Sequence, residues 1–364
     1  MTDSYTLYGQ EISLFTGKAR AYLRWKGVPF EEIRSTMAVY TSTIVPRVGY
    51  PIIPIVTTPE DETLQDTTII IDWFEEKLGG PSVYPSTPKQ KLAALLLEIY
   101  GDDWLVIPAM HYRWQYNRDW AMAQFGKNAM PEATEADQLA LGEKLSEKFR
   151  GFCLPLGITE ETAPAIEQSY EALLHDLDAH FADYPYLFGT RPSIGDFGLT
   201  GPLYAHQYRD PASRRIMEEH GPNVARWAER IQEPAEPLSG AFLPDDEIPQ
   251  TLLPVLKRMM AEQLPVLAST VSHLDTWLQE NPDTDIPRGI GFHDFSVEGV
   301  TGTRVIMTYT QWMLQRALGF YHSLVGDEKQ SADELLASVG GTALTQITIN
   351  QPLTIENYRL TRAS

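Results

Sequence analysis

The chain has 364 residues, more than a single hydrophobic core usually serves, so we expect two or three domains. Its formal charge of −20, from 49 Asp and Glu against 29 Lys and Arg, would repel phosphate backbones and argues against a nucleic-acid partner. The single cysteine, Cys153, excludes an internal disulfide and a metal cluster held by several cysteines.

Nothing in the sequence indicates a membrane partner. No apolar run approaches ~18 residues, the length that a membrane-spanning helix needs. The opening stretch, "MTDSYTLYGQ", lacks the basic and apolar regions of a signal peptide. We therefore expect a cytoplasmic protein.

The first 85 residues mix strand and helix patterns. Extended, β-branched runs predict strands in "YTLYG" (5–9), "VPFEEIR" (28–34), "PIIPIVTT" (51–58) and "TLQD" (63–66). Helical spacing predicts helices at 16–27 and in "TTIIIDWFEEKLGG" (67–80), the second ended by its two glycines. The predicted order is β-α-β-(α)-β-β-α, and the prolines of "YPSTPKQ" (84–90) mark a boundary.

Residues 89–245 have the apolar spacing of helices. The segments "KQKLAALLLEIYGDDWLVIPAMHYRW" (89–114) and "APAIEQSYEALLHDLDAHFADY" (163–184) are the longest examples. Ser193 and Asp196, in "SIGDFGLTG", form a variant capping box that starts another helix. This part of the chain is predicted to be all-helical.

Residues 246–364 are expected to be mostly helical as well. A helix with a kink before Pro265 is followed by a predicted hairpin, "GFHDFSVEGVTGTRV", in which apolar and polar residues alternate. Another helix is predicted at 304–324, and the end of the chain is expected to be a strand or a wrapped tail.

Several separated segments resemble the cytosolic glutathione transferases in their order and spacing. The segment "YTLYG…SLFTGKARAYLRWKGVPFEEI" is similar to that family's first strand, catalytic turn, helix and second strand. "IIPIV" is similar to its Val-Pro-x-Leu step, "LQDTTIIIDWFEEK" to its Leu-x-Glu-Ser-x-x-Ile segment, and "YPSTP" to its interdomain linker. "LFGTRPSIGDFGL" and "PNVARWAERI" are similar to its helix-capping signature and its Pro-Asn-x-x-x-Trp ending.

The resemblance covers roughly residues 5 to 233 and implies an α+β fold. It implies a thioredoxin-like, glutathione-binding α/β domain at 1–85 and an all-helical glutathione-transferase domain at 89–245. Residues 246–364 lie beyond the usual family length and form a C-terminal extension to which the resemblance assigns no role.

Ser13 is the candidate catalytic residue. A free thiol with a pKa near ~8.5 is only a few per cent thiolate at neutral pH, and a hydroxyl at the positive end of a helix can stabilise the thiolate. Counted back from Val28-Pro29-Phe30, Ser13 stands where theta-class relatives place a serine and omega-class relatives a cysteine. The alternative is that Ser13 only caps the helix. Thr16 is expected to cap or support the turn.

The resemblance also implies the residues that hold glutathione as cosubstrate. Asp66 and Thr67 match the acidic-polar pair that binds its γ-glutamyl end, although they can equally start a helix. Pro54, if cis, would present the backbone of Ile53 to the cysteinyl part. The resemblance does not place the residue that holds the glycyl carboxylate, and Arg47 is the candidate.

A second substrate is expected against the first helix of the helical domain. The pocket candidates there are Trp104, His111, Tyr112, Arg113 and Trp114, which would supply aromatic and cationic contacts. The alternative is that this aromatic stripe is core packing.

The sequence predicts no metal site. His175 and His180 are five positions apart and do not share a helical face, so we expect a solvated surface there. Lys18, Arg20 and Arg24 are likewise expected on a helix surface, solvated or paired.

The leading hypothesis is a glutathione-dependent transferase or lyase that joins the thiolate to a small apolar electrophile, in a detoxification role and as a homodimer. The alternative is a non-catalytic module that binds glutathione or a protein partner. Thiol–disulfide exchange would need a nucleophilic cysteine where Ser13 stands, and the sequence argues against it.

Overall fold

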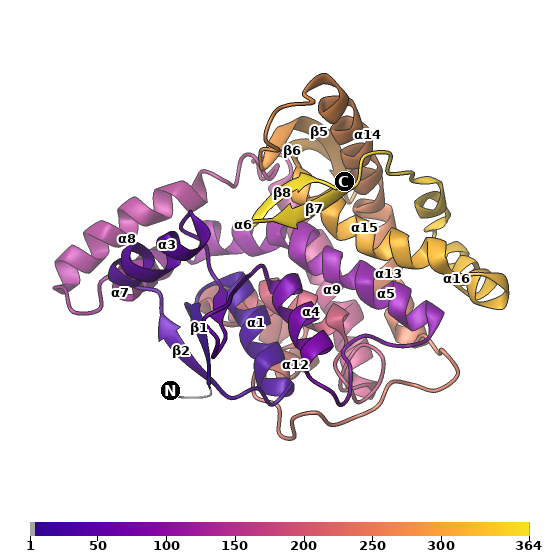
Figure 1. Cartoon of the computed structure of the whole chain (residues 1–364), viewed down its shortest axis with the longest axis horizontal. Coiled ribbons are helices and arrows are strands. Elements are labelled where there is room, and N and C mark those ends of the chain that lie inside the picture. Colours follow the sequence, from indigo (N-terminus) through magenta and orange to yellow (C-terminus); the bar gives the residue numbers. More distant parts are fainter. Residues whose placement is uncertain (1–3, 364) are drawn as a thin grey trace. The chain divides into compact units, whose positions relative to one another are not determined.

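The computed structural model describes residues 4–363, which form two compact units (Figure 1). The first unit consists of the chain up to Val83 together with Ala109–Phe152 and Leu199–Gly240. The second consists of Tyr84–Pro108, Cys153–Gly198 and the chain from Ala241 onward. The predicted helical part, 89–245, therefore supplies residues to both units. The division of the sequence into domains at 1–85, 89–245 and 246–364 stays a prediction.

A four-stranded sheet in the order β2-β1-β3-β4 forms the centre of the first unit (Figure 1). Its strands are β1 (Tyr5–Gly9), β2 (Phe30–Arg34), β3 (Ile55–Thr57) and β4 (Thr63–Gln65). The β1–β2 pair is parallel and the β1–β3 and β3–β4 pairs are antiparallel. With helices α1 (Leu14–Trp25) and α4 (Thr67–Lys77), this is the predicted thioredoxin-like arrangement.

Three short helical segments connect β2 to β3: α2 (Met37–Val39), η1 (Tyr40–Ile44) and α3 (Val45–Val48). They occupy the place of the bracketed helix in the predicted order. Helix α1 buries the apolar residues that its spacing predicted, with Ala19, Tyr22 and Leu23 fully buried.

Two charged residues of α1 are buried, so their predicted place on the helix surface is wrong, although Arg20 is paired as the sequence allowed. Arg20 is 1% exposed because it forms two hydrogen bonds of 2.6 Å to the carboxylate of Glu32 on β2. Lys18 is fully buried and its Nζ donates to Oγ1 of Thr68 on α4 across 3.4 Å.

Helical segments complete the first unit. They are the second parts of α6 (Val106–Tyr116) and α10 (Ile194–Pro202), with α7 (Arg118–Ala129), α8 (Glu135–Arg150), η3 (Leu203–Tyr208), α11 (Pro211–His220) and α12 (Pro222–Gln232). Helices α7 and α8 approach so closely that a Cβ at Gly126 would lie 1.7 Å from the carbonyl oxygen of Gln138. Glycine is therefore required at this crossing.

The second unit is mainly helical. Its elements within the family-like part are α5 (Pro88–Ile99), η2 (Tyr100–Trp104), the first part of α6, α9 (Ala163–Asp183) and the first part of α10 (Ile194–Pro202). The predicted capping box at α10 is confirmed, since the Asp196 carboxylate accepts from the Ser193 N–H across 2.8 Å. Ser193 Oγ in turn accepts from the Asp196 N–H across 3.4 Å.

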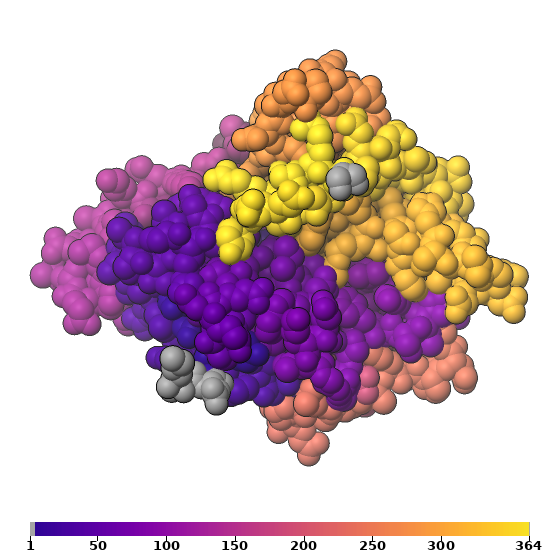
Figure 2. Space-filling model, in the orientation of Figure 1, coloured from indigo at the N-terminus to yellow at the C-terminus, as the bar shows by residue number. Residues whose placement is uncertain are grey.

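The C-terminal extension belongs to this second unit, and Figure 2 shows it in orange and yellow as one continuous surface. It contains η4 (Gln250–Leu252), α13 (Leu253–Glu262), α14 (Leu264–Glu280), β5 (Gly289–Val297), β6 (Val300–Met307), α15 (Thr308–Ser323), α16 (Gly326–Ser338), η5 (Thr342–Gln346), β7 (Leu353–Glu356) and β8 (Arg359–Arg362). The predicted kink is the break between α13 and α14 at Gln263, and the predicted hairpin is β5–β6. Helix α15 begins at Thr308 rather than at the predicted 304, because 304–307 complete the pairing of β6 with β5.

The extension packs against α5 and α9 within the second unit. Arg316 of α15 donates to the buried carboxylate of Glu98 across 2.8 Å and to the hydroxyl of Tyr84 across 2.8 Å. Asp246, at the start of the extension, accepts from the N–H groups of Lys89 and Gln90 and so caps α5. The extension thus supplies both side chains and a helix cap to the family-like helices.

His180 corrects one expectation from the sequence. His175 is exposed as predicted, but His180 is fully buried, with Nδ1 3.0 Å from Oγ1 of Thr251 and Nε2 3.3 Å from the carbonyl oxygen of Tyr186. In the described part of the chain, no three His, Cys, Asp or Glu side chains gather to hold a metal. Among residues 4–363, no helix is both long and apolar enough to cross a membrane.

Candidate functional site

The register of the sheet brings three connecting segments of the first unit to one edge. Tyr8 near the end of β1 pairs with Ile55 at the start of β3, and Ile55 pairs with Gln65 at the end of β4. The segments that follow β1, precede β3 and follow β4 therefore leave the sheet side by side. They carry the predicted residues Ser13, Ile53 and Pro54, and Asp66 and Thr67.

Ser13 is the N-cap of α1, and its Oγ accepts from the N–H of Thr16 across 3.3 Å. The side chain is half-buried, and within residues 4–363 its hydroxyl donates to no acceptor. The first turn of α1 contains no acidic residue that would offset the positive helix end. The cap and the predicted donor role are therefore compatible. The cap uses a lone pair of Ser13 Oγ, and the hydroxyl hydrogen can still be donated to a ligand.

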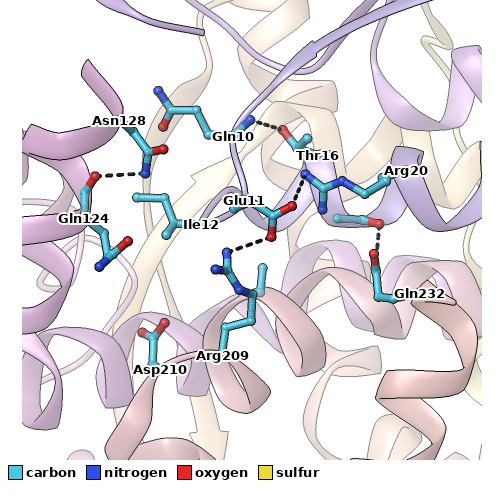
Figure 3. A network of polar contacts seen from close by, with 12 residues as sticks. Gln10, Glu11, Ile12, Thr16, Arg20, Gln124, Asn128, Arg209, Asp210 and Gln232 are labelled. Carbon is cyan, nitrogen blue, oxygen red and sulfur yellow. Dashed lines mark hydrogen bonds and ion pairs between the residues drawn. The ribbon is translucent and has the colours of Figure 1, made fainter. Parts of the chain in front are cut away.

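Thr16 supports the turn between β1 and α1. This residue is fully buried, and its Oγ1 accepts from the backbone N–H of Gln10 across 3.4 Å (Figure 3). A Cβ at Gly9 would lie 2.2 Å from Cγ2 of Thr16, so only glycine fits there. Thr16 thus has the supporting role that the sequence allowed.

The Ile53–Pro54 peptide bond is cis, as the resemblance implies. Ile53 is half-buried. Neither its N–H nor its C=O has a hydrogen-bond partner within the described residues. A buried or half-buried backbone amide normally has a partner, so this pair of groups is suited to an extended peptide ligand.

Asp66 begins α4. Its Oδ1 accepts from the N–H groups of Thr68 and Ile69, at 2.9 and 3.3 Å, and its backbone has a φ of 80°. Thr67 is the first residue of the helix and is buried. The helix-start reading of this pair is therefore present in the structure, and it leaves a carboxylate at the same sheet edge as Ser13.

Arg47, the guess for the glycyl carboxylate, is engaged within the protein. It donates to Oγ1 of Thr63 across 3.0 Å and forms an ion pair with Asp61. These contacts fix α3 to the turn between β3 and β4. A carboxylate ligand would have to compete with Asp61 for this guanidinium.

The five pocket candidates divide between the two units. Trp104 belongs to the second unit, where its Nε1 donates to Glu262 across 3.1 Å and its ring lines a cavity of about 20 Å³, room for about one water molecule. His111, Tyr112, Arg113 and Trp114 belong to the first unit and are at most 9% exposed.

These four side chains of α6 are packed inside the first unit. The rings of His111 and Tyr112 lie 5.4 Å apart, and that of Trp114 stacks on Phe125 at 5.9 Å. Arg113 pairs with Asp210 and has all five of its donors occupied, so it has no N–H left for a substrate. The sequence missed this pairing, because Arg113 and Asp210 are 97 positions apart and no local pattern links them.

Two family models match the chain. Residues 7–82 match the glutathione S-transferase N-terminal domain, and residues 160–230 match the glutathione S-transferase C-terminal domain. Two segments of the chain are therefore similar to the two domains of the glutathione S-transferase family, in the same order.

The segment that matches the N-terminal domain contains every residue predicted for catalysis and glutathione binding, from Ser13 to Thr67. The pocket candidates at 104–114 lie in neither matched segment, and neither do the residues after 230. The matched family therefore bears on the sheet edge and not on the pocket or the extension.

Several solved structures that match part of this chain are glutathione S-transferases. One from Rhodospirillum rubrum has 14% identity and a TM-score of 0.41, with 68% of this chain and 96% of that chain covered. One from Methylobacterium radiotolerans, in complex with glutathione sulfonate, has 18% identity and a TM-score of 0.39, with 68% and 100% covered. One from Methylobacillus flagellatus with glutathione bound has 15% identity and a TM-score of 0.39, with 64% and 96% covered. No curated protein matches the chain.

Proposed function

We propose that this protein is a glutathione-dependent transferase or lyase that joins the glutathione thiolate to a small apolar electrophile. The observation that carries the proposal is that the segments bearing Ser13, the unpartnered Ile53 backbone and the Asp66 carboxylate leave the sheet at the same edge. The matches of residues 7–82 and 160–230 to the two glutathione S-transferase domains support glutathione as the ligand.

Glutathione would lie along this edge as an extended peptide. The N–H and C=O of Ile53 would pair with the backbone of its cysteinyl residue. Asp66 would accept from the γ-glutamyl ammonium, and the first N–H groups of α4 would donate to the γ-glutamyl carboxylate. These contacts bring the cysteinyl sulfur towards the start of α1.

Ser13 would then stabilise the thiolate. Its hydroxyl hydrogen, which has no acceptor among residues 4–363, would donate to the sulfur at the positive end of α1. Lowering a thiol pKa of ~8.5 by about two units corresponds to roughly 2.7 kcal/mol and leaves most of the thiol ionised at neutral pH. The sulfur electron pair forms the new carbon–sulfur bond, and the leaving group departs with the pair it shared with that carbon.

The apolar class of the electrophile rests on the resemblance, because His111, Tyr112 and Trp114 are packed inside the first unit and Arg113 has its donors occupied. A detoxification role and a homodimer rest on the resemblance, and a cytoplasmic location completes the proposal.

Calorimetric titration tests the site. We would titrate glutathione and S-methylglutathione into the wild type, Ser13→Ala and Ser13→Thr, in buffers of different ionisation enthalpy near neutral pH. The wild type and Ser13→Thr should release a proton on binding glutathione and none with the methylated ligand. Ser13→Ala should bind glutathione without releasing the proton.

A matched control separates the donor role from the cap. Thr134 caps α8 in the same way, with Oγ1 accepting from the Asp137 N–H across 3.2 Å, so Thr134→Ala should leave proton release unchanged. Turnover of a chlorodinitrobenzene should fall about 10²-fold in Ser13→Ala, as for the loss of one stabilising donor. Binding without any turnover in the wild type would favour the non-catalytic module, and no binding up to millimolar glutathione would overturn the proposal.

A further inference from the structure

Arg113 is a buried arginine whose whole donor set is used. It lies in the last turn of α6 and is 2% exposed. Nε and Nη2 donate to the two carboxylate oxygens of Asp210, each across 2.7 Å. Nη2 also donates to the carbonyl of Ala205 across 2.8 Å. Nη1 donates to the carbonyl of Ile12 across 2.9 Å and lies 2.7 Å from Nε2 of His206. A planar guanidinium bound this way has one orientation.

The neighbours of Arg113 determine the protonation of His206 and Asp210. Nδ1 of His206 lies 3.1 Å from the carbonyl oxygen of Ala109, so we assign the proton to Nδ1, and Nε2 accepts from Arg113. Burial, followed by the charge of Arg113, lowers the pKa of His206 well below its ordinary value and keeps the ring neutral. Burial raises the pKa of Asp210, and the charge and hydrogen bonds of Arg113 oppose that rise.

The carbonyl that Arg113 holds belongs to the peptide group that leads into Ser13. The oxygen of Ile12 and the nitrogen of Ser13 lie in one rigid plane, so fixing the oxygen fixes the position from which the Ser13 side chain departs. The other end of the same peptide is fixed as well, because the Ser13 N–H donates to the carbonyl of Gln10 across 3.0 Å. Ile12 itself is 2% exposed, which keeps water from replacing the guanidinium.

The other side-chain contacts of the turn between β1 and α1 are weaker than that of Arg113 or lie further from Ser13. Figure 3 shows Glu11 between Arg20 and Arg209, at 3.5 and 3.1 Å, but its side chain is 51% exposed and these ion pairs are screened by solvent. Gln10 donates to the carbonyl of Ser35 across 2.7 Å, three residues before Ser13. Arg113 is therefore the buried, charged contact closest to the candidate catalytic residue.

We propose that the Arg113–Asp210 pair is a positioning pair that holds the Ile12–Ser13 peptide so that the Ser13 hydroxyl points at the glutathione sulfur. This inference rests on the proposed function. Arg113 touches neither substrate, so it acts on the thiolate through Ser13 alone. Loss of the pair should weaken thiolate stabilisation and leave the Ile53 and Asp66 contacts to glutathione intact.

The test compares two variants with a control. Arg113→Met with Asp210→Leu removes both charges together, which proteins tolerate better than the loss of one buried partner. Arg113→Lys keeps the charge beside Asp210 but loses the planar fork that reaches Ile12. Arg304→Met with Asp103→Leu removes another buried Arg–Asp pair, in the second unit, as the matched control.

The readout is the pH dependence of the thiolate absorbance of bound glutathione, with kcat and KM measured separately. We expect both Arg113 variants to have about a tenfold smaller thiolate fraction near neutral pH and a kcat about ten- to a hundredfold lower. KM for glutathione should change less than about threefold, and the control should behave as the wild type.

The two hypotheses fail differently. If wild type and Ser13→Ala behave as proposed but Arg113→Lys keeps the wild-type thiolate titration, the positioning role is overturned and the proposed function stands. If the wild type binds no glutathione, both are overturned. Should the double variant fail to fold, the Arg113→Lys titration alone decides.

Discussion

The guanidinium of Arg304 donates to the carboxylate of Asp103 across 3.0 Å, although the two residues are 201 positions apart in the chain. Asp103 lies in η2, the π-helical segment between α5 and α6, and Arg304 lies on β6 of the extension. Thr310 and Gln263, also from the extension, donate to the same carboxylate at 2.9 and 3.1 Å. The extension therefore satisfies a buried charge of the family-like helices.

Removal of this carboxylate should destabilise the second unit. Asp103→Ala leaves the guanidinium of Arg304, 1% exposed, without its counter-charge, and we expect a loss of about 3–5 kcal/mol in the free energy of unfolding. Glu218→Ala, which breaks the exposed Arg214–Glu218 pair, should cost less than about 1 kcal/mol. Denaturant unfolding followed by tryptophan fluorescence compares the two, and equal losses would contradict the prediction.

A chain that ends at residue 245 should not fold as a compact protein. Helices α15 and α16 pack on α5, and residues such as Leu314 and Leu318 are at most 3% exposed, so truncation would uncover the apolar face of α5. We expect binding of a hydrophobic dye and the loss of near-ultraviolet circular dichroism. A truncated chain with a wild-type melting temperature would identify 246–364 as an independent domain.

The elements of the first 85 residues could be predicted because their signals are local. Alternation, Gly79 and Gly80, and the pattern around Asp66 are each readable within a few residues. The contacts of Asp103 could not be predicted, because its partners Gln263, Arg304 and Thr310 are more than 150 positions away in the chain. The burial of Lys18 could not be predicted for the same reason, since its partner Thr68 is 50 positions away on another helix.

The α7–α8 crossing should depend on Gly126. A Cβ there would lie 1.7 Å from the carbonyl oxygen of Gln138, so Gly126→Ala should force the helices apart and destabilise the protein by about 1–3 kcal/mol or more. Gly319→Ala in α15, where a Cβ meets no atom within 4 Å, should stabilise it by roughly 0.5–1 kcal/mol through helix propensity. Thermal unfolding by circular dichroism measures both, and a neutral Gly126→Ala would show that the helices can separate freely.

Glutathione affinity should depend on the charge of Asp66. Asn keeps the cap and tolerates the positive φ, so Asp66→Asn should fold normally and bind glutathione about tenfold or more weakly, because a charged acceptor is lost. Asp246 offers a matched control, since it too has a positive φ, of 55°, and caps a helix through two N–H groups. Calorimetry should find unchanged affinity in Asp246→Asn; equal weakening in both would mean that the effect is one of folding.

The local structure around the candidate site could be predicted, but the contacts that support it could not. Ser13, Pro54 and Asp66 stand in recognisable local patterns, and the cis peptide bond before Pro54 is present as implied. Arg113 was interpreted as a cationic contact for a substrate, because its partner Asp210 is 97 positions away and no local pattern links them. Burial decides between the two roles, and burial depends on tertiary packing.

Stability at acid pH should depend on His180. Burial lowers the pKa of His180 to about 4, against an ordinary 6.5, so between these values the unfolded chain binds a proton that the folded chain does not. The stability contributed by the neutral ring is therefore complete above about pH 6.5 and is lost as the pH falls towards 4. Between about pH 7 and pH 4.5 this loss amounts to about 2 kcal/mol.

His180→Gln isolates this contribution. The glutamine amide can donate to the Tyr186 carbonyl and accept from Thr251 as the ring does, but it does not titrate. Its free energy of unfolding should therefore fall by about 2 kcal/mol less than that of the wild type over the same pH range. His175→Gln, on the exposed face of the same helix, should follow the wild-type curve. Parallel curves for wild type and His180→Gln would mean that His180 is protonated in the folded protein, which its contacts with Thr251 and Tyr186 and its complete burial oppose.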